Sequence, residues 1–160
     1  MKSKQVTTAT KQSKDEKLIS QALRCLESKM KYTSNEYFLS SKQVGAYFQL
    51  QIAAEKNEIF SVMFMNNKHQ LISFEKMFYG TINEAVVYPR SIVQKALELN
   101  AAVVIVGHNH PSSGEAMPSE ADINITKDLK KILGLISVKL LDHIIVTATG
   151  AFSFSDHQLI

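Results

Sequence analysis

Cysteine is nearly absent from this 160-residue sequence, in which Cys25 is the single example. One cysteine cannot form an intramolecular disulfide, so the sequence excludes the small disulfide-stabilised domains of secreted proteins. We therefore expect a cytoplasmic protein. Cys25 falls on the apolar stripe of a predicted helix, and we expect it to be a small core residue.

Long hydrophobic runs are also absent, because no apolar segment approaches the roughly 20 residues that a membrane-spanning helix needs. The first residues, MKSKQVTTATKQSK, contain no apolar stretch of the kind found in a secretory signal. Hydrophobic residues still make up 45% of the chain, which is enough for a core. The length suits one compact domain, and we expect a soluble protein that does not enter a membrane.

The sequence lacks an overall excess of positive charge outside its N-terminus. Lys2, Lys4, Lys11 and Lys14 contribute four positive charges to a net charge of +3, which leaves −1 on the rest of the chain. We expect residues 1–14 to form a disordered basic leader. Binding to nucleic acid, if it occurs, should be weak and should depend on this leader.

The spacing of apolar residues predicts helices and strands in mixed order, without internal repeats. A first helix is expected over residues 15–31, and a second after a cap signal at Ser40-Ser41, with a stripe of Val44, Tyr47, Phe48 and Ile52. Further helices are expected from Pro89, with Ile92, Val93, Ala96 and Leu97 inside, and from Ser119. Strands are expected over residues 59–65, 70–78, 84–88, 101–106, 139–146 and 151–154. This order predicts an α/β fold with helices packed around a mixed sheet.

Residues 107–122, GHNHPSSGEAMPSEAD, carry the most informative pattern, and they directly follow the apolar strand AAVVIV. In an extended backbone, residues i and i+2 point to the same side. The imidazoles of His108 and His110 can therefore reach one metal ion. Pro111 then ends the strand.

Asp122 is the third candidate ligand, in the first turn of a helix with Ser119 at its N-cap. A capping box alone would explain this pair, with Asp122 bonding only to the Ser119 backbone. Asp122 also heads an apolar stripe that continues through Ile125, Leu129 and Ile132, and a buried carboxylate needs a partner. Two histidines and a carboxylate leave one zinc position open to water. The imidazoles favour zinc over magnesium, with iron and manganese as alternatives.

A hydrolytic zinc site also needs a general base that is not a ligand. Spacing does not choose among six glutamates: Glu55, Glu58, Glu75, Glu84, Glu115 and Glu120. Glu58 differs from the others in standing at the start of the apolar strand 59–65. His143 precedes the apolar run IIV, and we expect it to support a ligand or pack rather than bind the metal. His69 and His157 are expected at the surface.

At these residues the sequence resembles the RadC-like branch of the MPN/JAMM family. The resemblance covers residues 40–154 through Glu58-Ile-Phe, Gly80-Thr-Ile-Asn, Pro89-Arg90, His108-Asn-His-Pro-Ser, Pro118-Ser-Glu-Ala-Asp122 and Leu141-Asp-His143. It implies an MPN/JAB, cytidine-deaminase-like sandwich over residues 40–160, preceded by a helical segment over 15–39. It also implies one Zn²⁺ per chain, bound by His108, His110 and Asp122. Glu58 would be the general base, and Ser119 would help to hold the oxyanion.

The resemblance implies a zinc metallopeptidase that cleaves peptide or isopeptide-like amide bonds in an unidentified peptide or protein substrate. The alternatives are a RadC-like accessory protein associated with DNA repair and a non-catalytic MPN scaffold that binds a protein. The complete set of ligands and base favours an enzyme over a scaffold. Asn109 stands where deubiquitinating relatives have serine, and the loop from His110 to Asp122 is one residue longer than usual. Residues 1–39 offer no helix-hairpin-helix motif, as expected for a short form.

Overall fold

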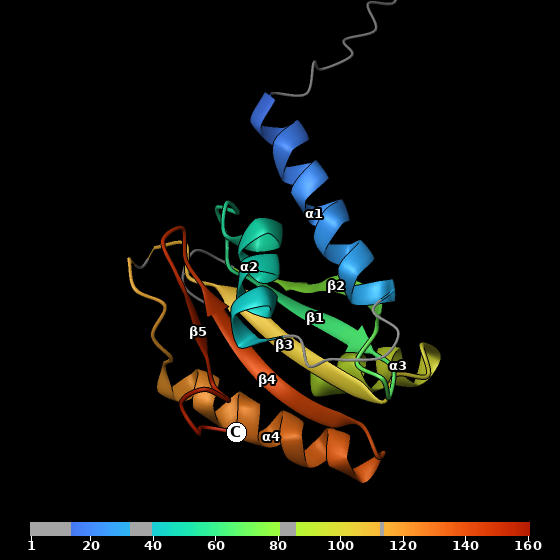
Figure 1. Ribbon diagram of the computed structural model, residues 1–160. Helices are drawn as coiled ribbons and strands as arrows, with labels where there is room; N and C mark the ends of the chain where they lie inside the picture. The colour runs from blue at the N-terminus through green and yellow to red at the C-terminus, as the bar shows by residue number, and fades with distance from the viewer. Residues whose placement is uncertain (1–13, 33–39, 81–85, 113) are drawn as a thin grey trace, which may run out of the picture.

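The computed structural model describes residues 14–32, 40–80, 86–112 and 114–160 (Figure 1). In chain order its elements are α1 (Lys14–Tyr32), α2 (Ser41–Ile52), β1 (Ile59–Met65), β2 (Leu71–Tyr79), α3 (Pro89–Glu98), β3 (Val103–Asn109), α4 (Glu120–Leu135), β4 (Lys139–Val146) and β5 (Ala151–Ser153). The predicted basic leader lies outside the described residues except for Lys14, with which α1 begins.

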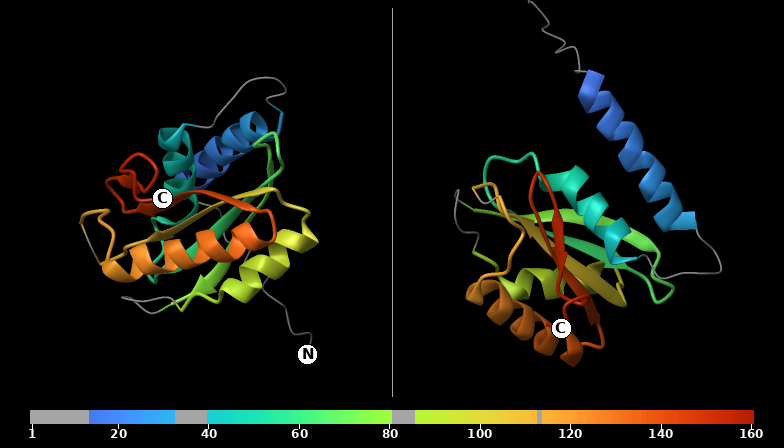
Figure 2. Two further views of the ribbon diagram at one scale, coloured as in Figure 1. Left: turned by 90° about the horizontal axis from the view of Figure 1, so that it is seen from below. Right: turned by 60° about the vertical axis from the view of Figure 1, so that its left-hand side comes forward.

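The five strands form one mixed sheet in the order β2-β1-β3-β4-β5. Among the strands of the described residues, only β3 and β4 pair in parallel, and α4 connects these two strands. Helices cover both faces: α2 lies on one side of the sheet and α4 on the other (Figure 1), and α3 lies beside α4 (Figure 2). The predicted α/β fold, a mixed sheet flanked by helices, is confirmed.

Side chains of β1 and β3 alternate between two hydrophobic clusters, as the pleat of a strand requires. Met63 and Ile105 belong to the cluster under α1 and α2. Phe60 and Val106 belong to the cluster under α3 and α4. Because the alternation continues along β3, His108 faces the side of the sheet that α4 covers.

Helix α2 begins at the predicted cap, where the Ser40 side chain accepts from the Gln43 backbone and the Gln43 side chain accepts from Ser40. Its predicted apolar stripe is fully buried. Phe48 of this stripe packs against Gly107, where a Cβ atom would lie only 2.6 Å from the Phe48 ring and 2.7 Å from the Ile144 carbonyl oxygen. A glycine is therefore required directly before His108.

Four predictions of local structure need correction. Strand β3 begins at Val103 rather than residue 101 and continues to Asn109, so His108 lies within the strand. Residues 86–88 are not a strand, and residues 84 and 85 lie outside the described part of the chain. Leu97 is 59% exposed, because α3 buries only Ile92 and Ala96 completely.

The fourth correction concerns α1, whose N-terminal part projects from the sheet (Figure 1). Cys25 is exposed, so the prediction that it is a core residue is wrong. Leu18 is 69% exposed, whereas Leu23 and Leu26 pack against the core. The helix therefore docks through only part of the stripe that its sequence displays. No helix in the described part of the chain has the length and hydrophobicity to span a membrane.

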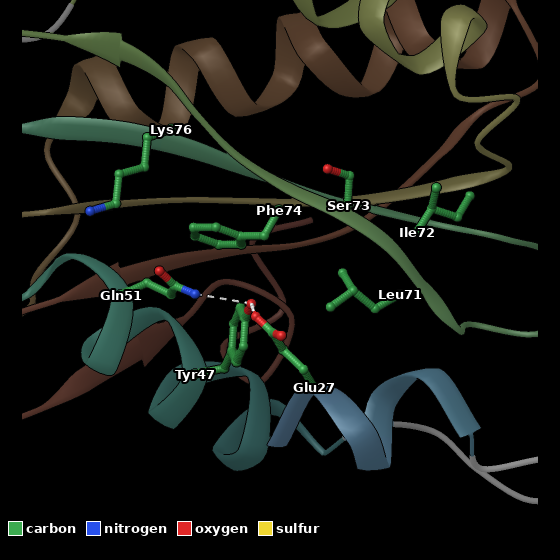
Figure 3. A pocket seen from close by; sticks show the side chains of 8 residues that line it. All are labelled: Glu27, Tyr47, Gln51, Leu71, Ile72, Ser73, Phe74 and Lys76. Carbon is green, nitrogen blue, oxygen red and sulfur yellow. Dashed lines mark hydrogen bonds between the residues drawn. The ribbon is translucent and has the colours of Figure 1, made fainter. Parts of the chain in front are cut away.

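A cavity of about 290 Å³ lies where α1 and α2 meet β2 (Figure 3). Within it, the Tyr47 hydroxyl donates to Glu27 at 2.9 Å and accepts from the Gln51 amide at 3.0 Å. Burial and the neighbouring Glu27 raise the pKa of Tyr47 above its usual range. The bond between Tyr47 and Glu27 attaches α2 to α1, on the face of the sheet opposite His108.

Candidate metal centre

Three side chains predicted as ligands converge beside the end of β3. The Nε2 atoms of His108 and His110 lie 2.9 Å apart. Asp122 reaches them from the first turn of α4, with Oδ1 3.2 Å from His108 Nε2 and Oδ2 3.8 Å from His110 Nε2. One ligand atom from each residue lies within 4.8 Å of the others, so this group could hold a metal ion.

The spacing of these atoms fits a small tetrahedral ion. Zinc bonds to nitrogen and oxygen at about 2.0–2.2 Å, which places neighbouring tetrahedral ligand atoms roughly 3.3–3.6 Å apart. The separations of 2.9, 3.2 and 3.8 Å bracket that value. The side chain of His108 is 1% exposed, whereas His110 and Asp122 are 19% and 14% exposed. The group therefore opens to solvent on the side of His110 and Asp122.

Strand pairing fixes the two histidines. Phe60 of β1 lies opposite His108 in the antiparallel register, and the two rings stack with an interplanar angle of 8°. The His110 backbone N–H donates to the Val146 carbonyl at 2.9 Å, which extends the pairing of β3 with β4 by one residue. His110 therefore leaves the sheet in an orientation that the sheet determines.

Asp122 is held by the capping box that the sequence predicted. Its Oδ2 accepts from the Ser119 hydroxyl at 2.7 Å and from the Ser119 backbone N–H at 2.8 Å. The N-terminal end of α4 further favours a negative charge at this position. The Asp122 carboxylate thus caps α4 and approaches the two histidines at the same time. The Ser119 hydroxyl hydrogen points to Asp122, and its contact with an oxyanion stays a prediction.

A buried chain of polar groups lies behind His108. His108 Nδ1 lies 2.9 Å from His143 Nε2, and His143 Nδ1 lies 2.6 Å from the Thr126 hydroxyl. That hydroxyl donates to the backbone carbonyl of Asp122 at 2.5 Å. His143 thus contacts a candidate ligand without joining the group. Sequence reasoning missed Thr126, although its position four residues after Asp122 places both on one side of α4.

Burial keeps the two inner histidines neutral. It lowers the pKa of His108 to about 4, against the attraction of the Asp122 carboxylate. Burial, followed by repulsion from His108 and His110, holds the pKa of His143 well below its usual range. Imidazole binds metal in its neutral form, so His108 is ready to act as a ligand at pH 7.

Asn109, between the two histidines, fixes the chain on both sides of Glu58. Its Oδ1 accepts from the Ile59 backbone N–H at 2.7 Å. Its amide nitrogen donates to the carbonyls of Asn57 at 3.1 Å and Glu55 at 3.3 Å. We refer to these three hydrogen bonds as the Asn109 clamp. Through it, the strand that carries the histidines also positions the segment that carries Glu58.

Glu58 directly precedes β1, and its carbonyl accepts from the Gly80 N–H at 2.8 Å, which extends the β1–β2 pairing. The β1–β3 pairing ends with Phe60 opposite His108, and Glu58 precedes Phe60 by two residues. Glu58 then shares a face with Phe60 and His108.

The other candidate bases are less well placed. Glu55 forms an ion pair with Lys76 at 2.7 Å, and Glu75 accepts from Ser73 at 2.7 Å. Glu115 and Glu120 are exposed, in the loop before α4 and at its first residue. Glu84 lies outside the described residues.

Comparison with known sequences agrees with the family that the motifs resemble. The sequence model of the RadC-like JAB domain matches residues 38–159. A UPF0758 protein of Xylella fastidiosa is 52% identical over 113 residues, which are 71% of this chain and 50% of that protein. The UPF0758 protein YkfG of Escherichia coli is 41% identical over 146 residues, or 91% of each chain. This chain thus spans about half of the Xylella relative and nearly all of YkfG.

Proposed function

Because this chain belongs to the RadC-like JAB domain family, we propose that it is a zinc-dependent hydrolase of the JAMM type that cleaves a peptide or isopeptide-like amide bond. The observation that carries the proposal is the convergence of His108, His110 and Asp122 within 4.8 Å, on a side that solvent reaches. Three protein ligands with an open position are typical of catalytic zinc sites, whereas structural sites use four protein ligands.

The contacts and positions of the side chains support the proposed roles. His108, His110 and Asp122 would hold the ion, and Ser119 keeps the Asp122 carboxylate turned towards the histidines. Bound zinc supplies Lewis-acid polarisation of the amide carbonyl and a lowered pKa of water. Glu58 takes a proton from the attacking water and delivers it to the leaving amine. The position of Glu58, two residues before the Phe60 that pairs with His108, supports this role.

The same arrangement supports the proposed substrate class. A general base and an open ligand position suit attack on an unactivated carbonyl, and an amide also needs its leaving nitrogen protonated. One carboxylate that accepts and then returns a proton serves both requirements. We therefore propose an amide in a peptide or protein as the substrate.

The test compares zinc-loaded wild type with Glu58→Gln on a peptide and isopeptide library read by mass spectrometry. Glutamine keeps the size of the side chain but cannot take up the proton. We expect cleavage by wild type and a loss of about 10²–10⁴-fold in the variant, with unchanged zinc content and melting temperature. Glu120→Gln, which alters an exposed glutamate of the same helix end, is the control and should cleave like wild type. Equal rates for Glu58→Gln and wild type would remove Glu58 from the mechanism.

A further inference from the structure

The buried chain behind His108 connects two candidate ligands by hydrogen bonds alone. It runs from the His108 ring through His143 and Thr126 to the backbone carbonyl of Asp122. It crosses from β3 to β4 and then to α4, and His108, Thr126 and His143 are each at most 1% exposed. Water does not compete for these groups, so their donors and acceptors must match one another.

The direction of each hydrogen bond follows from counting hydrogens. The Asp122 carbonyl can only accept, and the Thr126 hydroxyl has one hydrogen, which it donates there at 2.5 Å. Towards His143 the same oxygen must therefore accept. The hydrogen on this side of His143 is consequently bound to Nδ1, 2.6 Å from the hydroxyl.

The remaining nitrogens follow in turn. A neutral imidazole with its hydrogen on Nδ1 has a lone pair on Nε2. A charged His143 is disfavoured, because the ring is fully buried with Phe154 stacked on it at 4.7 Å and Phe60 against its edge. The lone pair of His143 Nε2 must therefore accept from His108 Nδ1, at 2.9 Å.

We propose that Thr126 and His143 form a relay that fixes His108 in the tautomer with hydrogen on Nδ1, so that its Nε2 lone pair faces His110 and Asp122 before any metal binds. This inference rests on the proposed metal site and assigns Thr126 and His143 as positioning residues. Without the relay, His108 would divide between two tautomers, and only one of them can bind a metal through Nε2.

The relay also distinguishes the two ligand histidines. With a lone pair on His108 Nε2, the His110 Nε2 atom at 2.9 Å must donate to it in the metal-free protein. That hydrogen has to leave Nε2 before His110 can bind an ion. Zinc should therefore change the tautomer of His110 and leave that of His108 as it was.

The first experiment reads the tautomers directly, by histidine nitrogen and carbon NMR on metal-free and zinc-loaded wild type near neutral pH. We expect His108 and His143 with hydrogen on Nδ1 in both samples, and His110 with hydrogen on Nε2 only in the metal-free one. Hydrogen on Nε2 of His108 in the metal-free protein would overturn the relay. This measurement needs neither a variant nor a substrate.

The second experiment uses a matched pair at position 126, with zinc affinity measured by competition with a chelator. Thr126→Ser keeps the hydroxyl and should bind zinc like wild type. Thr126→Val keeps the shape, removes the hydroxyl, and should lose about 10–100-fold in affinity, as for other groups that orient metal ligands. It should also place part of the His108 population in the other tautomer. Equal affinities for both variants would refute the relay.

The two proposals can fail separately. If wild type shows the expected tautomers and binds zinc but cleaves no amide, the relay stands and the hydrolase proposal falls. If wild type cleaves an amide with His108 in the other tautomer, the relay falls and the hydrolase stands.

Discussion

Replacing Asn109 by alanine tests whether the strand that carries the histidines also positions Glu58, the proposed general base. The change removes the three hydrogen bonds of the Asn109 clamp. The carbonyls of Asn57 and Glu55 lie near the surface, where water can replace the lost donor. The Ile59 N–H cannot be rescued in this way, because Ile59 is only 2% exposed.

The expected loss of stability depends on which of the three groups water can reach after the substitution. An unpaired buried N–H costs about 1–3 kcal/mol, and two partly solvated hydrogen bonds are worth about 0.5–1.5 kcal/mol each before water replaces them. We expect Asn109→Ala to lower the free energy of unfolding by about 2–4 kcal/mol. For a chain of this size that corresponds to a fall in melting temperature of about 4–16 °C.

The assay combines calorimetry, zinc content and amide cleavage. Asn109→Ala should retain zinc, because the three ligands are unchanged, yet lose kcat at temperatures where it remains folded, because Glu58 is no longer fixed. Asn66→Ala is the control: Asn66 also makes three hydrogen bonds, with Lys68 and Gln70, at the other end of β1. It should lower stability without affecting kcat. Wild-type kcat in folded Asn109→Ala would refute the argument.

Three further predictions concern metal, pH and nucleic acid. Elemental analysis should find about one zinc per chain in wild type. The zinc should be lost in His108→Ala and Asp122→Asn and retained in the control His157→Ala. Equal zinc content in all variants would refute the assignment of the metal site. The pKa of His108 is near 6.5 in the unfolded chain and about 4 in the folded protein. The metal-free protein should therefore lose stability as pH falls from about 6.5 to 4. The contribution of His108 to this loss is on the order of 3 kcal/mol. Denaturant titrations at pH 7 and 5 with equal midpoints would contradict this. DNA binding should be weak and should disappear when residues 1–14 are deleted or salt is raised to about 200 mM; binding that survives both changes would refute the electrostatic explanation.

Local sequence patterns predicted the elements that depend on short-range chemistry. Strand β1 lies where its apolar run was read, and the caps at Ser40 and Ser119 form as their spacing indicates. The convergence of His108, His110 and Asp122 was also predictable, because a strand end and the next helix start confine all three to a short stretch of chain.

Features that depend on tertiary pairing were not predictable in this way. The apolar run ends at Val106, yet β3 continues through His108 because Phe60 and Ile145 pair with that residue from the two neighbouring strands. Periodicity gave α1 a continuous stripe, but only docking against the core decides that Leu23 is covered and Cys25 is not.

The sequence separations within the site bear on the order in which it forms. The three candidate ligands lie within 15 residues, so only a short loop must close to bring them together. The Asn109 clamp spans 50 residues to Ile59, and the relay spans 35 residues between the two histidines. A folding chain could therefore capture an ion before β1 joins β3. The proposed hydrolysis would begin only after that pairing positions Glu58, the proposed base, so metal uptake should precede activity during refolding.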